Sequence, residues 1–359
     1  MEHKPASVSE ATECRITFII GNGFDLNLQM KTRYADIYES YVTSPSRTSV
    51  IAAFKKDLGN YSQCNKWADF EMGMAEYART LPDENSFVEC IRDFKKHMVD
   101  YLEVENERIA EKISSPNNEP RVVFALEKAL HHFHERLTPN AMNQIADLWH
   151  NKGKRFRFLT FNYTDTLSFL FSAAEEYLQI YCKLTDVEFS PDILHIHGSL
   201  TKDVVLGVDN EDQLKDLPYS LSARGKRAFI KPLFNEQYDV QRIIQARKTI
   251  IDSSLICIFG FSLGDSDQMW VDCLADWLHA DTSHHLVYFE YDSNEYARCN
   301  FDELMDAEDE KKTKLLRRFG FAPKDRVGSQ IHVPIGDSIF DFELKEKVED
   351  IEDELPSML

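Results

Sequence analysis

The sequence predicts an α/β protein built on a mostly parallel, Rossmann-like sheet with helices on both faces. Short runs of apolar and β-branched residues recur along the chain, and segments with helical spacing separate them. Each run ends in small or polar residues, and in sheets of this kind ligands bind beyond the carboxyl ends of the strands. The 359 residues, 43% of them hydrophobic, can build a large core or two domains.

The first predicted strand, residues 16–20, stops at the Gly-Asn-Gly turn of residues 21–23. A helix is expected over 24–42, with Asp25 and Thr32 as candidate N-caps. Two glycines at a strand-to-helix junction allow a tight turn whose backbone N–H groups would approach a phosphate. A plain turn remains the alternative, because the third glycine of the dinucleotide fingerprint is missing.

The region after this helix carries apolar residues at helical spacing and no convincing strand. Residues 45–152 are therefore predicted to form an all-helical insertion domain. It would divide the Rossmann-like domain into segments 14–44 and 153–350, leaving 1–13 and 351–359 as flexible termini.

The strand pattern then returns six times, and three of the intervening segments have helical spacing. The predicted strands are residues 156–161, 193–197, 204–208, 255–259, 285–290 and 330–334, and the predicted helices are 167–177, 269–279 and 295–318.

Charge and composition exclude several classes of protein. The formal net charge of −20 disfavours nucleic acid and anionic membranes as partners. The seven cysteines never occur in Cys-x-x-Cys spacing, which argues for reduced thiols rather than a zinc ribbon or a disulfide scaffold. No apolar stretch is long enough to span a membrane and the first residues are polar, so a cytoplasmic protein is expected.

Four predicted strand ends carry polar clusters that would meet at one edge of the sheet: residues 21–25, 160–165, 195–199 and 260–262. In this order they resemble the NAD-binding segments of the sirtuins. The segments GNGFDL, FNYTDTL, HIHGSL and GFSLGDSD, with Trp67 and Asp69-Phe-Glu71, resemble more closely the AbiH family of bacterial abortive-infection proteins. That resemblance runs from about residue 15 to 335.

The resemblance to sirtuins implies roles for individual residues. His197 falls on the catalytic-base position, and Asn162 on the asparagine beside the nicotinamide-side ribose. Asp165 lies one residue further from Asn162 than the sirtuin aspartate does, and the cysteines of the sirtuin zinc module are absent. The residues implied to bind the nucleotide are Gly21, Asn22, Gly23, Phe24, Asp25, Asp165, Gly198, Gly260, Ser262 and Asp265.

These roles imply cleavage of the bond between nicotinamide and ribose, with NAD as the substrate and no metal. Without the wall of an acyl-lysine channel, water is the expected acceptor, which makes the reaction NAD hydrolysis rather than deacylation. The alternative is a non-catalytic module that senses NAD or ADP-ribose and signals through the insertion. A nuclease is disfavoured by the acidic balance. A phage-derived trigger, an operon partner and a homo-oligomer are further candidate partners.

Several candidate residues also have structural interpretations. His197 could be a core histidine bonded to a backbone carbonyl, and His195 either its partner or purely structural. Asp25 could cap a helix instead of binding ribose. Asp265 or Asp267 could complete a metal site with the two histidines, but these acids more naturally cap the helix that starts near residue 266.

Three further residues are candidates for contacts near the pocket. Trp67 and Glu71 are four residues apart, so on a helix they would share a face that leans over the pocket, although core packing is the simpler role for Trp67. Lys231 is a candidate for a phosphate or carboxylate contact.

Overall fold

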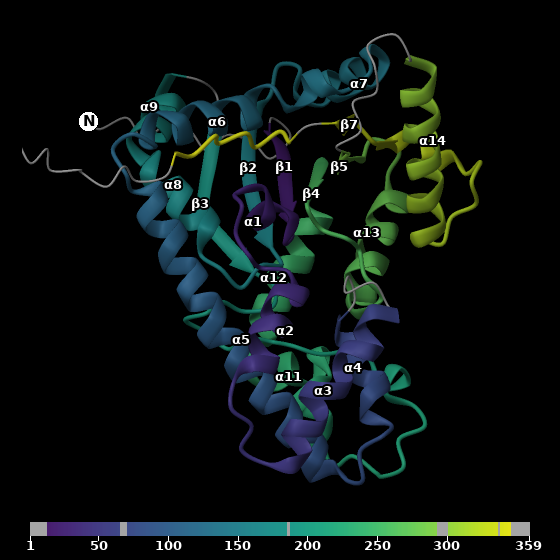
Figure 1. Ribbon diagram of the computed structural model, residues 1–359. Helices are drawn as coiled ribbons and strands as arrows, with labels where there is room; N and C mark the ends of the chain where they lie inside the picture. The colour runs from purple at the N-terminus through teal and green to yellow at the C-terminus, as the bar shows by residue number, and fades with distance from the viewer. Residues whose placement is uncertain (1–12, 65–69, 185–186, 293–300, 337, 346–359) are drawn as a thin grey trace, which may run out of the picture.

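The computed structural model describes residues 13–64, 70–184, 187–292, 301–336 and 338–345 (Figure 1). Trp67 lies outside the described residues, as do nearly all residues of the two predicted flexible termini.

Within the described residues, seven strands form one sheet with the order β3-β2-β1-β4-β5-β6, and β7 pairs with β5. All the pairings are parallel. This confirms the predicted α/β class, and the strand order is that of the Rossmann fold. The strands are β1 (Glu13–Ile20), β2 (Gly153–Thr160), β3 (Val187–His195), β4 (Leu255–Phe259), β5 (His285–Tyr291), β6 (Ile331–His332) and β7 (Ile335–Gly336).

Helices cover both faces of the sheet, which explains why its strands read as continuous apolar runs. One face packs on α6 (Glu119–His131), α7 (Pro139–Trp149) and α8 (Thr166–Ala173), beside α9 (Glu175–Leu184). The other face packs on α12 (Val240–Ile251), α13 (Gln268–Ala280) and α14 (Phe301–Arg318).

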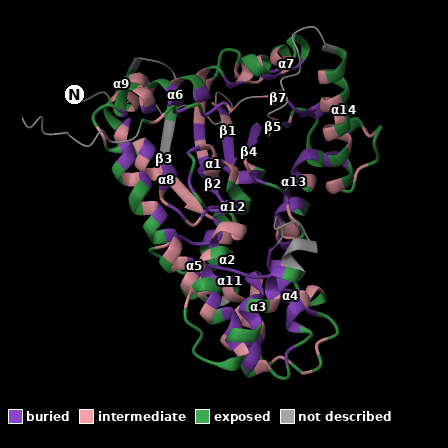
Figure 2. Ribbon diagram, viewed as in Figure 1, coloured by how far each residue is buried: buried purple, intermediate pink, exposed green. Residues whose placement is uncertain are grey.

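A separate helical body faces the carboxyl ends of the strands, below the sheet in Figure 1. Its inner surfaces are buried (Figure 2). It comprises α2 (Tyr34–Thr43), α3 (Ser49–Cys64), α4 (Phe70–Ala78), α10 (Ala223–Phe229), α11 (Lys231–Tyr238) and the first part of α5 (Glu84–Ile113). The 30 residues of α5 span about 45 Å, so this one helix joins the helical body to the sheet.

The helices of the predicted insertion over 45–152 are divided between the core of this helical body and the core beneath the sheet. Ile109, Val122 and Ile145 from that range belong to the same core cluster as Phe18 of β1. Helical periodicity shows that a helix has an apolar face, but does not show which surface will cover that face.

Two local predictions are also corrected. The helix predicted over 24–42 breaks into α1 (Gly23–Asn27) and α2. Asp25 and Thr32 are not N-caps, because their side chains bind Thr164 and Asn22 instead. The predicted strand over 204–208 forms only a single bridge from Val208, and its apolar side chains pack into the helical body.

Short 3₁₀ segments complete the described chain: η2 (Phe133–Arg136), η3 (Glu211–Leu214), η4 (Asp265–Asp267) and η5 (Arg326–Gln330). No helix in the described ranges combines the length and the apolar character that crossing a bilayer requires.

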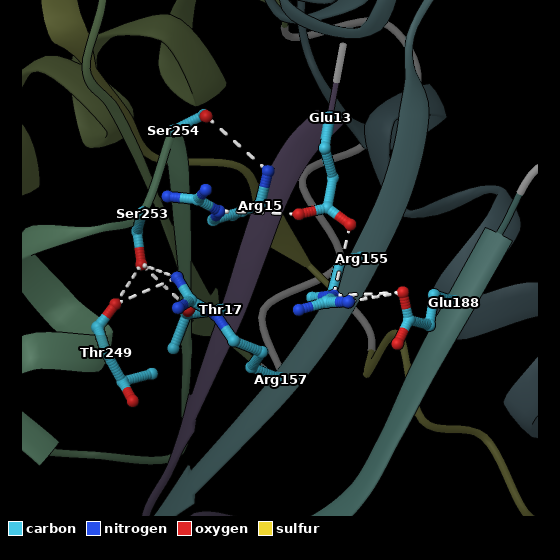
Figure 3. A network of polar contacts seen from close by, with 9 residues as sticks. All are labelled: Glu13, Arg15, Thr17, Arg155, Arg157, Glu188, Thr249, Ser253 and Ser254. Carbon is cyan, nitrogen blue, oxygen red and sulfur yellow. Dashed lines mark hydrogen bonds and ion pairs between the residues drawn. The ribbon is translucent and has the colours of Figure 1, made fainter. Parts of the chain in front are cut away.

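A polar network joins Thr17 of β1 and Arg157 of β2 to the end of α12 (Figure 3). The Arg157 guanidinium donates to the Thr249 carbonyl at 2.9 Å and to the Ser253 hydroxyl at 3.0 Å. The hydroxyls of Thr17 and Ser253 lie 2.7 Å apart. These contacts occupy the Thr249 carbonyl in the last turn of α12 and tie this helix to the middle of β1 and β2.

Candidate functional site

A cavity of about 590 Å³ lies between the carboxyl ends of the strands and the helical body. Its floor includes residues that follow β1, β2 and β4, and its roof includes residues of α2, α4 and α5. The strand order reverses between β1 and β4, so the cavity lies at the topological switch point where ligands bind in such sheets.

Seven of the predicted site residues line this cavity and five do not. The lining residues are Asn22, Gly23, Asp25, Asn162, His197, Gly260 and Ser262. The residues outside the lining are Gly21, Phe24, Asp165, Gly198 and Asp265.

The glycine turn after β1 packs against the turn after β4. The N–H of Gly21 donates to the Phe259 carbonyl at 3.0 Å, that of Gly23 to Gly260 at 2.9 Å, and that of Phe24 to Gly21 at 2.9 Å. A Cβ on Gly23 would lie 2.5 Å from the Gly260 Cα. The glycines therefore let two backbones touch, and these three N–H groups, which were predicted to approach a phosphate, are bonded within the protein.

The other residues outside the cavity have structural contacts. The Phe24 ring packs in the core at 5.1 Å from that of Phe340. The N–H of Asp165 donates to Oδ1 of Asn106 on α5 at 2.8 Å. Gly198 has a φ of +79°, a conformation that favours glycine. Asp265 is exposed and lies 3.5 Å from the Arg318 guanidinium.

Asp25 is a buried carboxyl on the cavity floor, with 1% of its surface exposed. Its Oδ2 accepts a hydrogen bond from the Thr164 hydroxyl at 2.6 Å, while its Oδ1 has no hydrogen-bond partner. Burial raises the pKa of Asp25 to about 6, although the polar side chains of Thr164, Thr166 and Asn162 act in the opposite direction. This carboxyl therefore changes charge near neutral pH.

Asn162 lies on the same floor, and its backbone is held from two sides. Its N–H donates to the Thr160 hydroxyl at 3.1 Å, and its carbonyl accepts from Nδ1 of His195 at 3.0 Å. The side-chain Oδ1 of Asn162 is buried without a partner. His195 does not line the cavity and positions the Asn162 backbone, which agrees with its structural interpretation.

His197 reaches the cavity beside a buried ion pair. Its Nε2 lies 3.1 Å from Oδ1 of Asp267 but is not aligned for a hydrogen bond. The same oxygen accepts from Nζ of Lys231 at 2.8 Å. Burial lowers the pKa of His197 and the charge of Lys231 lowers it further, while Asp267 opposes both effects.

The Asp267 side chain does not cap α13, contrary to prediction. Burial raises the pKa of Asp267, but Lys231 and His197 outweigh burial and hold this pKa well below its usual range. Lys231 was predicted to contact a phosphate or a carboxylate, and the carboxylate that it contacts is that of Asp267. Its Nζ also donates to the Ser266 carbonyl at 2.9 Å.

Several lining residues were missed by sequence reasoning. The rings of Phe161 and Phe261 stack with centroids 3.9 Å apart, and the Tyr34 hydroxyl donates to Glu71 at 2.7 Å. Glu71 lines the cavity from α4, and the sequence had placed it on a helix face that would lean over the pocket. The phenylalanines and Thr164 lie in or beside the polar strand-end segments, which was the available signal, whereas nothing local marked Tyr34.

The cavity lining carries the carboxyl groups of Asp25, Glu71 and Asp267, and an exposed Arg33 stands at its rim. In the described part of the chain, no group of three or more histidine, cysteine or acidic side chains is arranged to hold a metal ion. The cavity lining thus provides carboxyl groups that can act as acids, bases and hydrogen-bond acceptors.

A family model described as "Bacteriophage abortive infection AbiH" matches residues 17–318, which include every residue that lines the cavity. No curated protein matches the sequence.

Proposed function

Because the chain belongs to the bacteriophage abortive infection AbiH family, we propose that it acts in abortive infection by hydrolysing NAD to ADP-ribose and nicotinamide. Loss of NAD would stop the metabolism of an infected cell before the phage completes its growth. The proposal includes activation of the protein by a phage component or by a partner protein.

One observation supports a polar ligand in the cavity above all. Oδ1 of Asp25, Oδ1 of Asn162 and Nε2 of His197 are buried in the cavity lining without a hydrogen-bond partner. Buried polar atoms in folded proteins nearly always have partners, so three such atoms around one cavity call for a ligand or water to complete them. They come from segments that follow β1, β2 and β3.

The charges of the cavity suit one part of NAD in particular. The nicotinamide ring is cationic before cleavage, and the sugar becomes positively charged in an oxocarbenium-like transition state. The Asp25 carboxylate would favour both positive charges, whereas the charge of Asp267 is offset by Lys231. Arg33 at the rim would face the diphosphate.

In the proposed reaction, the bond between C1′ and the nicotinamide nitrogen breaks, and its electron pair stays on the nicotinamide. The oxygen of a water molecule bonds to C1′, and one proton of this water passes to the imidazole of His197. The lowered pKa of His197 keeps its imidazole neutral, and so able to accept that proton, near pH 7. The Asn162 side chain would orient the water or a ribose hydroxyl.

The test is nicotinamide release from NAD by the purified protein and by its His197→Ala and Asn162→Ala variants. Removal of a general base lowers turnover by about 100-fold or more. His150→Ala at the exposed C-cap of α7 and Asn143→Ala on its exposed surface serve as matched controls and should keep wild-type turnover. NAD in phage-infected cells should be measured in parallel, since a trigger can be required.

Undiminished nicotinamide release by both cavity variants would contradict this assignment. Stable NAD in infected cells that express the wild type would contradict the reaction itself.

A second function is favoured by the roof of the cavity. Glu71 and Met98 belong to the helical body, so a bound nucleotide would contact this body and the sheet together. A module that senses NAD or ADP-ribose would bind tightly without releasing nicotinamide, even during infection. Calorimetric titration with NAD, beside the release assay, separates the two functions.

A further inference from the structure

A surface groove adjoins the cavity at one edge. The groove has a volume of about 660 Å³ and lies between α2 and α5, which are neighbours in the helical body (Figure 1). Leu26 and Arg33 line both the groove and the cavity, so the two spaces meet at these residues. A ligand that is longer than the cavity can therefore continue into the groove.

The polar side chains of the groove follow an order along α2. This helix has 10 residues, about 15 Å of length, and Arg33 directly precedes it at the junction with the cavity. Further along α2 the groove is lined by Asp36, Glu39, Ser40 and Thr43. A ligand that leaves the cavity thus meets positive charge first and acceptor oxygens after it.

Lys31 and Arg33 are the cations at the junction, and both are exposed. Among the described residues, neither side chain forms an ion pair. The N–H groups of Gly21, Gly23 and Phe24 already have acceptors within the protein. A diphosphate therefore finds its partners at the two cations of the junction rather than at the glycine turn.

Tyr101 lines the groove from α5, and its side chain also packs against the core of the helical body. Burial raises the pKa of Tyr101 to about 12, and the charges of Glu105 and Asp36 act in the same direction. The Tyr101 hydroxyl thus lies near the acids of α2 and stays protonated at neutral pH. An aromatic ring in the wall of a polar groove offers a flat surface on which a heteroaromatic base can stack.

We propose that this groove binds the adenosine half of the dinucleotide, with the diphosphate at Lys31 and Arg33 and the adenine against Tyr101. The amino group of adenine and the hydroxyls of its ribose are hydrogen-bond donors, and the carboxylates of Asp36 and Glu39 can accept from them. The ligand would then follow the order of charges along α2.

The inference rests on the proposed nucleotide ligand, with its nicotinamide end beside His197, but not on the cleavage of this ligand. It departs from the resemblance to sirtuins, which implies Gly260 and Ser262 on the turn after β4 as nucleotide-binding residues. In the groove, the adenosine half would instead contact α2 and α5. The helical body would thus form part of the nucleotide site.

The experiment compares NAD with nicotinamide mononucleotide, which lacks the adenosine monophosphate half. Calorimetry measures the binding of both ligands, and kcat/KM for nicotinamide release gives the same comparison wherever a ligand is cleaved. The wild type should favour NAD at least about tenfold. In Tyr101→Leu this preference should fall about fivefold or more, because the stacking surface is lost, and the mononucleotide should behave as it does with the wild type.

Tyr219→Leu is the matched control. It makes the same change at another half-buried tyrosine of the helical body, outside the groove and the cavity, and should keep the wild-type preference for NAD. Ser262→Ala tests the competing position of adenosine. Loss of the preference in Ser262→Ala, with the preference retained in Tyr101→Leu, would place adenosine on the turn after β4 and overturn the inference.

Two results with the wild type alone would also overturn it: equal values for NAD and the mononucleotide, or no binding of either ligand at millimolar concentration. A preference that falls in Tyr101→Leu without any nicotinamide release would reject only the proposed hydrolysis. Nicotinamide release with a preference that survives in Tyr101→Leu would reject only this inference.

Discussion

Nε2 of His197 lies 3.1 Å from Oδ1 of Asp267, and the same oxygen binds Nζ of Lys231 at 2.8 Å. All three side chains are nearly enclosed by the protein. They come from the loop after β3, from η4 and from the first turn of α11, so the cluster joins the sheet edge to the helical body. Lys231 and Asp267 are thus positioning residues that fix the environment of the His197 imidazole.

The first prediction concerns Lys231→Met, which leaves the Asp267 carboxylate buried without its ammonium partner. We expect the free energy of unfolding to fall by about 3–5 kcal/mol, as when one partner of a buried ion pair is removed. The pKa of His197 should rise, because the charge of Lys231 lowers it. Urea unfolding and NMR titration of His197 measure the two effects.

Lys226→Met is the matched control for this change. Lys226 pairs with Glu211 at 2.7 Å on the surface, where such a pair contributes about 1 kcal/mol or less. Equal losses of stability in the two variants would show that burial does not strengthen the Lys231 pair.

The second prediction concerns stability and the protonation of Asp25. Its pKa is raised from 3.8 to about 6 in the folded protein, so between these pH values the folded protein keeps a proton that the unfolded chain has lost. The free energy of unfolding therefore falls as pH rises through this window, by about 3 kcal/mol from this group. Asp25→Asn should remove this loss and be more stable than the wild type at pH 7 and above.

Urea unfolding from pH 4 to pH 8 measures the difference between the two proteins. A constant difference across this range would contradict the elevated pKa of Asp25, whereas a difference that shifts in favour of the variant from about pH 4 to about pH 6 and then levels off would support it.

The third prediction concerns the glycines that bring the two turns together. Gly260 has a φ of +68°, and a Cβ there would lie 2.7 Å from the Gly23 Cα. Gly260→Ala should therefore lower the free energy of unfolding by at least about 2 kcal/mol. Gly328→Ala, whose Cβ would meet its nearest neighbour at 3.6 Å, should change it by about 0.5 kcal/mol or less. Thermal and urea unfolding compare the variants, and similar losses would show that the turns can separate.

The fourth prediction concerns a buried histidine pair at the other end of the sheet. Nδ1 of His285 and Nε2 of His332 lie 3.0 Å apart, and burial lowers the pKa of His332 to about 3. Below about pH 6.5, His332 becomes protonated in the unfolded chain but stays neutral in the folded protein. The free energy of unfolding therefore falls as pH decreases, by up to about 1.4 kcal/mol per pH unit. His332→Gln should make this slope shallower between pH 6 and pH 4.

His150→Gln on the exposed end of α7 is the control for this variant and should keep the wild-type slope. The slope is taken from urea midpoints at several pH values. An unchanged slope in His332→Gln would contradict the lowered pKa of His332.

Much of the fold was predictable because its signals are local. The strands β1, β4 and β5 are buried on both faces, and their continuous apolar composition predicts this burial. The polar strand ends were predictable for the same reason, since Asn162, His197 and Gly260 follow such runs and all line one cavity.

The errors arose where a distant contact overrode a local preference. Aspartate is a residue type that favours N-caps, but the carboxylate of Asp25 accepts a hydrogen bond from Thr164 instead. Asp267 precedes a helix, but its carboxylate binds Lys231, 36 residues earlier in the chain. In both cases the partner is supplied by packing between segments that are far apart in sequence.

The sequence by itself determined the parallel sheet, the helices after the first strand and the polar segments at the strand ends, because periodicity and composition act over a few residues. The tertiary structure decided which of these groups face a ligand. It bonded the N–H groups of the glycine turn within the protein and split the helical region between the sheet and a roof over the cavity. It also left one side-chain oxygen, Oδ1, of Asp25 and of Asn162 without a hydrogen-bond partner. Whether a buried polar atom is satisfied depends on every segment that packs around it, and no local pattern carries that information.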